Sequence, residues 1–477
     1  MIHLVQFRIL HQKQYLGRYT FFFFFFVASY CLSGQKVAID SISISGLEKT
    51  REYILIRELN FKKGDSLDLQ YLASIFQTNE KRLLNTNLVV EARCNLINLN
   101  IEAQSAGVNI HCKEALYIYP APLLEFIDND FNKWWRNYNR SLKRLSYGLF
   151  LSHINLTGNG DRLTIYGQAG FTKKISIDYD YPYLNHSNTL GIGFTGFYAA
   201  NREVAYKTID NFLVLKRNLD QDLLKRVKLG ARMFYRPAIY AKHLVEINYY
   251  HFNINDSLTT SYNPDYLNNR SKLSFPEFIY LFRYDTRDVV PYAMKGWSLG
   301  LYFSQIGLSR HDIHKSDAGL LLSGFFKITP KLSLEEHTLG RYNLDRGKVP
   351  YYFNKAIGYD DIYVRGYDLN VIDGQDYFLL KNIARYKVLG KELDWGKYMV
   401  LKAYRKMPLD VYLTGGFDIA RVADRFYAYG NPLTNKYVYG YGVGLDVVFY
   451  YNKLVRLEVS RNSSRNFGFY LHFDAGL

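Results

Sequence analysis

IYVRGYDLNVIDG at residues 362–374 and GGFDIA at residues 415–420 are the two stretches that decide the fold. The first lies in a long segment rich in Gly and Asp between two runs of alternating strand character, which is typical of a loop between strands. In the second, alternation places Asp418 on the polar face of a strand. Arg365 of the loop can pair with Asp418 if that polar face lines an enclosed space, because a guanidinium fork suits a carboxylate held in fixed geometry.

VRGY followed by a strand that carries GFD resembles the paired signature of the outer-membrane biogenesis and translocation barrels. This superfamily, also called the bacterial surface antigen family, includes BamA, TamA and the transporters of two-partner secretion. The resemblance implies that the Arg of the long loop folds into the barrel and meets the Asp of a lumen-facing strand. In this chain it implies a lumen lock formed by Arg365, Gly366, Tyr367 and Asp418.

Two further segments carry the resemblance. INLTGNGDRLTIYGQ at 154–168 is similar to the family's early hairpin, and FRYDTRDVVPYAMKGWSLGL at 282–301 is similar to its YDTRD, Pro, Gly block. Three charged residues of that block, Asp285, Arg287 and Asp288, are compatible with a metal or catalytic site, but a charged turn at a strand end is their ordinary use. The sequence departs from the family at Ala384, where Glu is frequent, which predicts that one lumenal contact is missing.

The composition favours a strand-rich membrane protein. The chain has 44 Tyr and 32 Phe, 17% aromatic residues in all, with 5 Met, and aromatic residues favour strands and membrane interfaces. The mean hydropathy is -0.20, and outside the N-terminus no apolar run approaches the roughly 18 residues of a spanning helix. A membrane protein with this hydropathy is therefore expected to be a barrel.

The N-terminus has the layout of a secretory signal peptide. Three cations, Arg8, Lys13 and Arg18, precede the apolar stretch TFFFFFFVASYC, which is too short to span and is followed by small residues. We assign residues 1–34 to this leader. Cys31 raises the alternative of a lipoprotein, but Ser29 and Tyr30 before it match poorly the small residues that a lipoprotein signal requires. Removing three cations from the formal charge of +16 leaves 16 minus 3, or +13, and an exported chain would not ordinarily meet nucleic acid.

Residues 35–114 are predicted to form a small α+β domain of order β-α-α-β-β. A strand from residue 37 is followed by a helix over 49–59, the turn FKKGD, a second helix and two strands. This order, with Gly64 and Asp65 before the second helix, resembles one periplasmic POTRA domain. Any other small α+β domain remains the alternative.

Cys94 and Cys112 are the two cysteines that remain once the leader is removed. A hairpin centred near residues 102–103 would place them almost opposite each other, at a separation that suits a disulfide in an oxidising compartment. Two buried thiols that act as small apolar residues are the other interpretation. The sequence leaves both open.

Residues 115–477 are predicted to form a transmembrane antiparallel β-barrel. Alternation gives about sixteen or seventeen strand candidates, with ambiguous boundaries between 170 and 255. A soluble sandwich would alternate as well, but the leader, the aromatic content and strands that reach the last residue favour the barrel. The final strand carries Phe467, Phe469, Leu471 and Phe473 on one face, although the chain ends in Leu477 rather than in an aromatic residue.

The seam between the first and last strands is predicted to be weak. If the first strand covers about 116–126, Pro120 and Pro122 remove two backbone donors from it. In the alternative, YPAP is only a linker and the first strand begins later.

These features predict an outer-membrane protein with a periplasmic domain that inserts or translocates proteins by strand addition at the seam. The expected partners are unfolded outer-membrane or secreted proteins and outer-membrane lipids, with periplasmic chaperones or lipoproteins as further candidates and no nucleic acid. No catalytic residue, metal or cofactor is expected. A passive porin is the alternative function, and a membrane-embedded hydrolase is disfavoured because no His lies in a recognisable nucleophile motif.

Overall fold

The computed structural model describes residues 36–474, except 127–144, 171, 186, 219, 291, 309–312, 360–361, 400–404 and 451–452. The predicted leader, Cys31 and Leu477 lie outside the described residues. Within these ranges, no helix combines the length and the apolar character that crossing a membrane requires.

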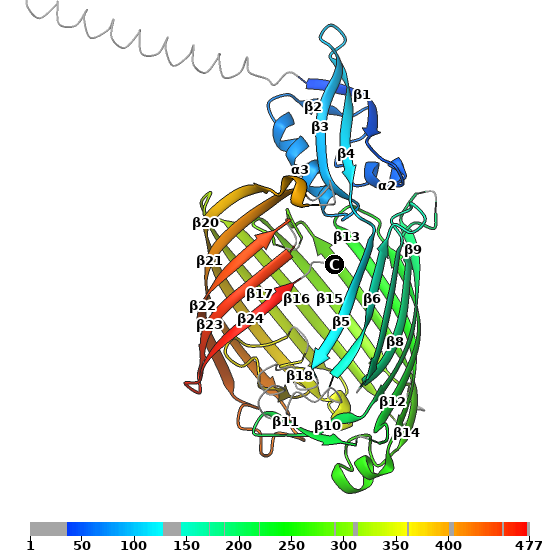
Figure 1. The fold of residues 1–477 in the computed structure, drawn as a ribbon, viewed down its shortest axis with the longest axis vertical. Helices are drawn as coiled ribbons and strands as arrows, with labels where there is room; N and C mark the ends of the chain where they lie inside the picture. Colours follow the sequence, from blue (N-terminus) through cyan, green and yellow to red (C-terminus); the bar gives the residue numbers. More distant parts are fainter. Residues whose placement is uncertain are drawn as a thin grey trace, which may run out of the picture.

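The N-terminal domain is a four-stranded sheet with two helices (Figure 1). The strand order is β2-β1-β4-β3, in which β1 runs parallel to β4 and the other pairs are antiparallel. The predicted β-α-α-β-β order is confirmed, with a three-residue strand added after FKKGD and a first helix shorter than predicted. The elements are β1 (Lys36–Ser45), α2 (Glu52–Ile56), β2 (Ser66–Asp68), α3 (Leu72–Leu84), β3 (Val89–Asn100) and β4 (Ser105–Glu114).

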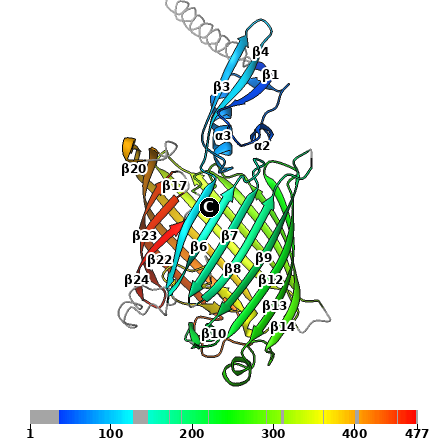
Figure 2. The ribbon, with the colours of Figure 1, turned by 45° about the vertical axis from the view of Figure 1, so that its right-hand side comes forward.

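Within the described residues from 115 onward, sixteen strands form one antiparallel sheet that curls into a barrel (Figures 1 and 2). The predicted fold class is therefore confirmed. The first eight strands of this sheet are β5 (Ile118–Phe126), β6 (Leu145–Ile154), β7 (Arg162–Gly170), β8 (Thr172–Tyr181), β9 (Leu190–Asn201), β12 (Leu224–Tyr235), β13 (Ala241–Ile254) and β14 (Lys272–Asp285). The remaining eight are β15 (Gly296–Ile306), β16 (Lys315–Lys327), β17 (Leu332–Asn343), β20 (Asp376–Asp394), β21 (Lys406–Ala423), β22 (Tyr437–Phe449), β23 (Lys453–Asn462) and β24 (Phe467–Asp474).

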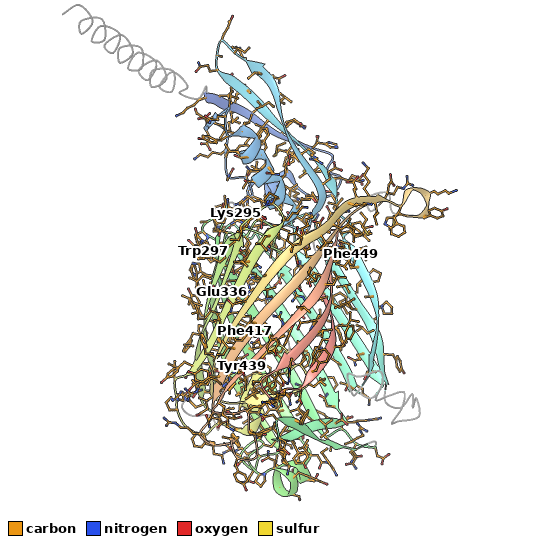
Figure 3. The ribbon with its side chains drawn as sticks, turned by 90° about the vertical axis from the view of Figure 1, so that its left-hand side faces the viewer. Lys295, Trp297, Glu336, Phe417, Tyr439 and Phe449 are labelled. Carbon is orange, nitrogen blue, oxygen red and sulfur yellow. The ribbon has the colours of Figure 1, made fainter. Side chains whose placement is uncertain are left out.

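Alternation along each strand separates an apolar outer face from a polar lumen. In β21, for example, Leu413 and Phe417 are exposed on the outside, whereas Thr414 and Asp418 are buried inside. The outer wall in Figure 3 carries the exposed rings of Trp297, Phe417 and Tyr439, with Glu336 on the same wall. Other exposed apolar side chains on outward positions are Leu229, Met233, Ile247, Tyr249, Val443 and Leu457.

β5 and β24 are the two ends of this sheet, and Figures 1 and 2 both place them next to each other on the barrel wall. Among the described residues, no backbone pairing joins them. Both Pro120 and Pro122 lie within β5, opposite Leu151 and Leu149 of β6. The first strand therefore includes YPAP, rather than beginning after it as in the linker alternative.

The two prolines remove donors from the free edge of β5. The carbonyl of Tyr117 accepts from the backbone N–H of Ile154 at 2.8 Å, so odd-numbered residues here direct their backbone groups toward β6. Because successive residues of a strand alternate in this direction, the nitrogens of Pro120 and Pro122 face away from β6, toward β24.

The N-terminal domain sits on one end of the barrel, which we call the near mouth, and the opposite end is the far end (Figure 1). The turn 155–161 binds the domain through Asn155 Nδ2, which donates to Thr50 Oγ1 at 2.9 Å, and through the N–H of Arg51, which donates to the carbonyl of Gly158 at 3.0 Å. A second contact joins Arg236, after β12, to both carboxylate oxygens of Glu58.

The far end carries the long connections. These are the β10–β11 hairpin, the π-helical turn η2 and the segment 344–375 between β17 and β20. A cluster that includes Phe252, Tyr266 and Phe275 packs these connections together. The short elements are β10 (Glu203–Ile209), β11 (Phe212–Arg217), η2 (Leu258–Tyr262), η3 (Tyr351–Phe353), β18 (Lys355–Ile357), β19 (Ile372–Asp373) and η4 (Gly396–Tyr398), of which η4 lies between β20 and β21 at the near mouth.

Candidate functional site: a loop enclosed by the barrel

The segment 344–375 folds back against the lumenal face of the last strands. Val364, Arg365 and Tyr367 are all buried, and Val364 and Tyr367 pack in one apolar cluster with Leu379, Ala420 and Val438 of the wall. Because these wall residues occupy the lumenal positions of β20, β21 and β22, the loop lies inside the barrel. Its motif is therefore enclosed by the wall rather than displayed to solvent.

Arg365 lies between two lumenal carboxylates. Its backbone N–H donates to Asp418 Oδ2 at 2.9 Å, and its Nε donates to Glu458 Oε1 at 3.0 Å. The guanidinium Nη1 is 3.6 Å from Asp418 Oδ1, an ion-pair distance that is too long for a good hydrogen bond. The side chain of Arg365 is 5% exposed and that of Asp418 is 0% exposed, so these charges interact with little screening by water.

The predicted meeting of Arg365 and Asp418 is present, but its geometry differs from the expected one. The sequence predicted a charge-assisted hydrogen bond between the two side chains, whereas the guanidinium donates to Glu458 and Asp418 accepts from the loop backbone. The sequence analysis did not single out Glu458. The signal that could have found it is alternation, because Val455, Leu457 and Val459 occupy the outward phase of β23 and so place Glu458 in the lumenal phase.

Glycines create the space that the loop occupies. A Cβ at Gly416 would overlap the guanidinium of Arg365, and a Cβ at Gly440 would overlap the carbonyl of Arg365. Gly366 itself has a φ of +76°, a left-handed conformation that other residues adopt at a cost, and its Cβ would lie 3.0 Å from the backbone nitrogen of Asn462. The loop backbone thus packs directly on the wall at these positions.

Gly366 and Tyr367 anchor the loop to the end of β23. Asn462 Nδ2 donates to the carbonyl of Gly366 at 2.7 Å, and the hydroxyl of Tyr367 lies 2.7 Å from Ser463 Oγ. Arg365, Gly366 and Tyr367 of the predicted lumen lock therefore contact β21, β23 or the turn after β23, and Asp418 lies on β21. Asn462 and Ser463 are contributors that the sequence analysis missed.

Lys381 of β20 takes the position opposite Asp418 in the strand register. Its Nζ is 3.6 Å from Asp418 Oδ2 and donates to the carbonyl of Tyr363 at 3.0 Å. Ala384 is exposed on the outward face of the same strand, so it does not occupy a lumenal position. The expectation that a lumenal contact is missing at Ala384 is therefore wrong, because this residue faces outward. The charged lumenal residue nearby on β20 is Lys381.

A second lumenal network lies nearer the near mouth. The turn 286–295 inserts Tyr292, whose hydroxyl donates to Asp446 Oδ2 at 2.9 Å. Arg456 makes two bonds of 2.7 Å to the same carboxylate. Arg385 stacks 4.0 Å from the centre of the Tyr292 ring, donates to the carbonyl of Ala293 at 2.9 Å and pairs with Glu335. The turn is thereby held against the wall strands β20, β22 and β23.

The charged residues of the same turn serve its geometry. Arg287 donates through Nε and Nη2 to the carboxylate of Asp285, at 2.9 and 2.6 Å. Asp288 accepts from the backbone N–H groups of Met294 and Lys295 at 3.0 and 3.1 Å, and from Lys81 of α3 at 3.1 Å. Burial acts to raise the pKa of Asp288, but these bonds and Lys81 outweigh it and lower the pKa below its usual value. The ordinary interpretation as a charged turn accounts for all three residues.

Cys94 and Cys112 lie on the buried face of the N-terminal domain as free thiols. Cys94 is opposite Ile110 and Cys112 is opposite Ala92, so the two cysteines are diagonal neighbours rather than almost opposite each other. Burial, with a smaller effect of Glu80, raises the pKa of Cys94 to about 12, and burial raises that of Cys112 to about 11. The structure therefore shows the second of the two interpretations, in which both cysteines are buried free thiols.

Comparison with known proteins gives structural neighbours but no sequence relatives. No family model and no curated protein matches the chain. BamA from Haemophilus ducreyi lacking POTRA domains 1–3 is 13% identical, with a TM-score of 0.49 over 92% of this chain and 83% of that chain. CdiB from Escherichia coli is 10% identical, with a TM-score of 0.47 over 93% and 89%. CdiB from Acinetobacter baumannii is 13% identical, with a TM-score of 0.48 over 92% and 73%.

At these identities and TM-scores, neither activity nor substrate passes from those proteins to this chain. The chain's own structure has a sixteen-stranded barrel, a preceding α+β domain and a loop arginine beside Asp418. These are the features that the resemblance to the outer-membrane biogenesis and translocation barrels implies.

Proposed function

We propose that this chain resides in a bacterial outer membrane, where it inserts or translocates unfolded polypeptides by strand addition at a weak seam. In this proposal residues 1–34 are a signal peptide, 35–114 a periplasmic domain and 115–477 the barrel. The observation that carries it is the enclosed loop, in which Arg365 is held between Asp418 and Glu458. Such a mechanism needs no nucleotide and no catalytic residue.

The wall supports a location in the membrane. Exposed Leu, Ile, Val and aromatic side chains occupy the outward positions of consecutive strands, where water would disfavour them and lipid would not. With the N-terminal domain in the periplasm, the far end faces the cell exterior.

The seam supports the use of strand addition. β5 and β24 each pair on one side, and the prolines leave the free edge of β5 short of donors. An incoming strand can add to the edge of β24, because main-chain hydrogen bonds form there regardless of the sequence of the client.

A passive outer-membrane channel is the alternative, and depletion separates the two. Depletion of the protein should lower the amount of one client or of many barrel proteins. Comparing the outer-membrane and surface proteomes before and after depletion measures this change. Loss of solute uptake with an unchanged proteome would support the channel instead. A decrease in many barrel proteins would indicate insertion, and a decrease in one secreted protein would indicate translocation.

Locking the seam tests the mechanism directly. Cysteine pairs placed across β5 (Ile118–Phe126) and β24 (Phe467–Asp474), in a background with Cys94 and Cys112 replaced by alanine, would form disulfides that hold the barrel shut. Client assembly should stop when the lock is oxidised and recover when it is reduced. Assembly that continues with a folded, oxidised barrel would contradict lateral opening.

A further inference from the structure

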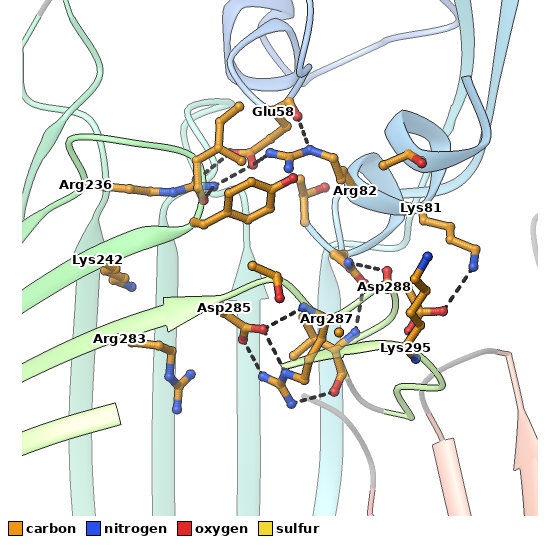
Figure 4. Close-up of a pocket in the computed structure, with 18 of the residues that line it drawn as sticks. Glu58, Lys81, Arg82, Arg236, Lys242, Arg283, Asp285, Arg287, Asp288 and Lys295 are labelled. Atoms are coloured by element: carbon orange, nitrogen blue, oxygen red, sulfur yellow. Dashed lines mark hydrogen bonds and ion pairs between the residues drawn. The ribbon is translucent and has the colours of Figure 1, made fainter. Parts of the chain in front are cut away.

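A cavity of about 910 Å³ lies between the N-terminal domain and the near mouth. Figure 4 shows its walls, which come from α3, the turns 236–240 and 286–295, and the near ends of β13 and β14. It is separate from the enclosed loop, which contacts the far halves of β20 to β23. A cavity of this size can hold several side chains of an extended polypeptide.

The acidic groups of this cavity already have partners. Glu58 accepts from Arg236, with 2.7 Å between Nη2 and Oε2, and is 3.8 Å from Arg82. Asp285 is bound by Arg287, and Asp288 by Lys81 and two backbone N–H groups, as described above. These acids are therefore not available to neutralise further cations.

Four cations of the lining have no carboxylate in hydrogen-bond or ion-pair contact within the described part of the chain. They are Lys242, Arg283, Lys295 and Lys327, and all four are exposed. Lys242 lies 4.6 Å from the centre of the Phe234 ring, and Figure 4 draws Lys242 and Arg283 without a bonded partner among the residues shown. The cavity thus has an excess of positive charge.

Lys242 and Arg283 face each other directly in the register of β13 and β14. Like charges at directly opposed positions of an antiparallel pair repel and destabilise the sheet. An anion that binds between them would offset this repulsion. The pair therefore has the arrangement of an anion-binding site rather than that of a structural contact.

The phase of the strands indicates where the anion comes from. Lys242 and Arg283 lie in the same phase as Asn248 and Glu277, which bond to each other in the lumen, whereas Ile247 and Tyr249 are exposed on the outer wall. A bilayer lipid on the outer wall cannot reach lumenal side chains, but a polypeptide that enters between the domain and the mouth can. Ile54, Tyr183 and Ile239 add apolar surface to the same cavity.

We propose that this cavity binds an extended polypeptide segment in which acidic and apolar side chains alternate, with Lys242 and Arg283 as the main contacts for its carboxylates. The inference rests on the proposed function, since it names the client segment that the near mouth receives. Charge-assisted bonds from these cations give the segment its affinity.

The test measures binding of a fluorescein-labelled peptide that alternates Glu and Leu to the purified full-length protein in nanodiscs, by fluorescence anisotropy. The double variant Lys242→Gln/Arg283→Gln should bind at least about tenfold more weakly, since each charge-assisted hydrogen bond contributes about that factor. The matched control is Lys391→Gln, which removes an exposed cation from the near end of β20. Affinity of the wild type should fall as salt rises.

A second variant keeps the test decisive if the first is poorly folded. Lys242→Glu/Arg283→Glu should no longer bind the Glu–Leu peptide and should bind a peptide that alternates Lys and Leu instead. Heat-modifiable migration in gels reports whether each variant is folded. Equal loss in Lys391→Gln, or equal affinity of the wild type for both peptides, would overturn the proposal. Displacement of the peptide by glycerol phosphate in preference to free glutamate would assign the site to a phosphate group and would also overturn it. Binding to the purified protein does not depend on client assembly, so its failure is distinguishable from failure of the proposed function.

Discussion

Arg365 shows how one residue can hold a loop inside a barrel. It reaches two carboxylates on different strands, Asp418 on β21 and Glu458 on β23, and its own backbone supplies one of the bonds. Its guanidinium donates to Glu458 through Nε and lies at ion-pair distance from Asp418, with 3.6 Å between Nη1 and Oδ1. The residue therefore ties a connection from the far end to strands that are distant in sequence.

Substituting Arg365 with alanine should destabilise the barrel. The change keeps the backbone N–H from which Asp418 accepts but removes the guanidinium that donates to the buried Glu458, and breaking a buried ion pair in this way costs roughly 3–5 kcal/mol. Thermal unfolding followed by heat-modifiable gel migration measures the loss. The control is Arg461→Ala, an exposed arginine on the outer face of β23, which should shift stability by at most about 0.5 kcal/mol. Equal stability of the two variants would contradict the lumen lock.

The two cysteines of the N-terminal domain should react slowly in the folded protein. Their pKa values are raised to about 12 and about 11, so at pH 8 the reactive thiolate is scarcer than in an unfolded chain, and burial adds a barrier to access. Because the pKa is raised, labelling should increase with pH up to those values. Maleimide labelling followed by mass spectrometry should find two free thiols after denaturation without reductant. Finding none would establish the disulfide alternative.

At the scale of elements, the loop and the strands that carry it fit through glycines. The carbonyl of Arg365 lies where a Cβ of residue 440 would be, so β22 admits the loop only because Gly440 has no side chain. The lumenal surface of β21 and β22 is therefore polar and also has the shape that this loop requires.

Gly440→Ala should weaken the enclosed loop, because its methyl group overlaps a backbone atom that cannot rotate away. Overpacking of this kind costs roughly 1–3 kcal/mol. Limited proteolysis of the segment 344–375 in the folded protein measures its release. Gly415→Ala, on the adjacent strand β21, is the control, since nothing lies within 4 Å of a Cβ at that glycine. Similar protection in both variants would count against direct packing of the loop on β22.

At the scale of the whole molecule, the N-terminal domain and the barrel are joined by a few polar contacts around the cavity at the near mouth. Glu58 is the centre of one contact, because Arg236 of the barrel and Arg82 of α3 both approach it. The turn 286–295 is another, since it contacts α3 through Asp288 and the lumen through Tyr292. The turn 286–295 thus links the position of the N-terminal domain to the side chains in the lumen next to the near mouth.

Glu58→Ala should loosen the domain on the barrel. It removes both bonds from Arg236, and a hydrogen bond to a charged group contributes roughly 1.5–3 kcal/mol. Hydrogen exchange should rise in the turn 236–240 and at the C-terminal end of α3, while the barrel strands stay protected. Glu48→Ala, at an exposed acid of the same domain, should leave exchange unchanged. A rise confined to the interior of the domain would indicate unfolding instead of release.

The sequence by itself determined the architecture and the inward-facing residues, whereas the tertiary structure decided which of them meet. A strand has a side-chain period of two, so alternation alone places Asp418, Asp446 and Glu458 on the lumenal face, and the strand-forming runs predict about sixteen strands. Periodicity carries no information on how the register of neighbouring strands and the path of a long loop bring residues together. Arg365 bonds to Glu458, which is 93 positions away, and Tyr292 bonds to Asp446, which is 154 positions away. For the same reason the cavity at the near mouth, to which two parts of the chain contribute, could be found only in the folded molecule.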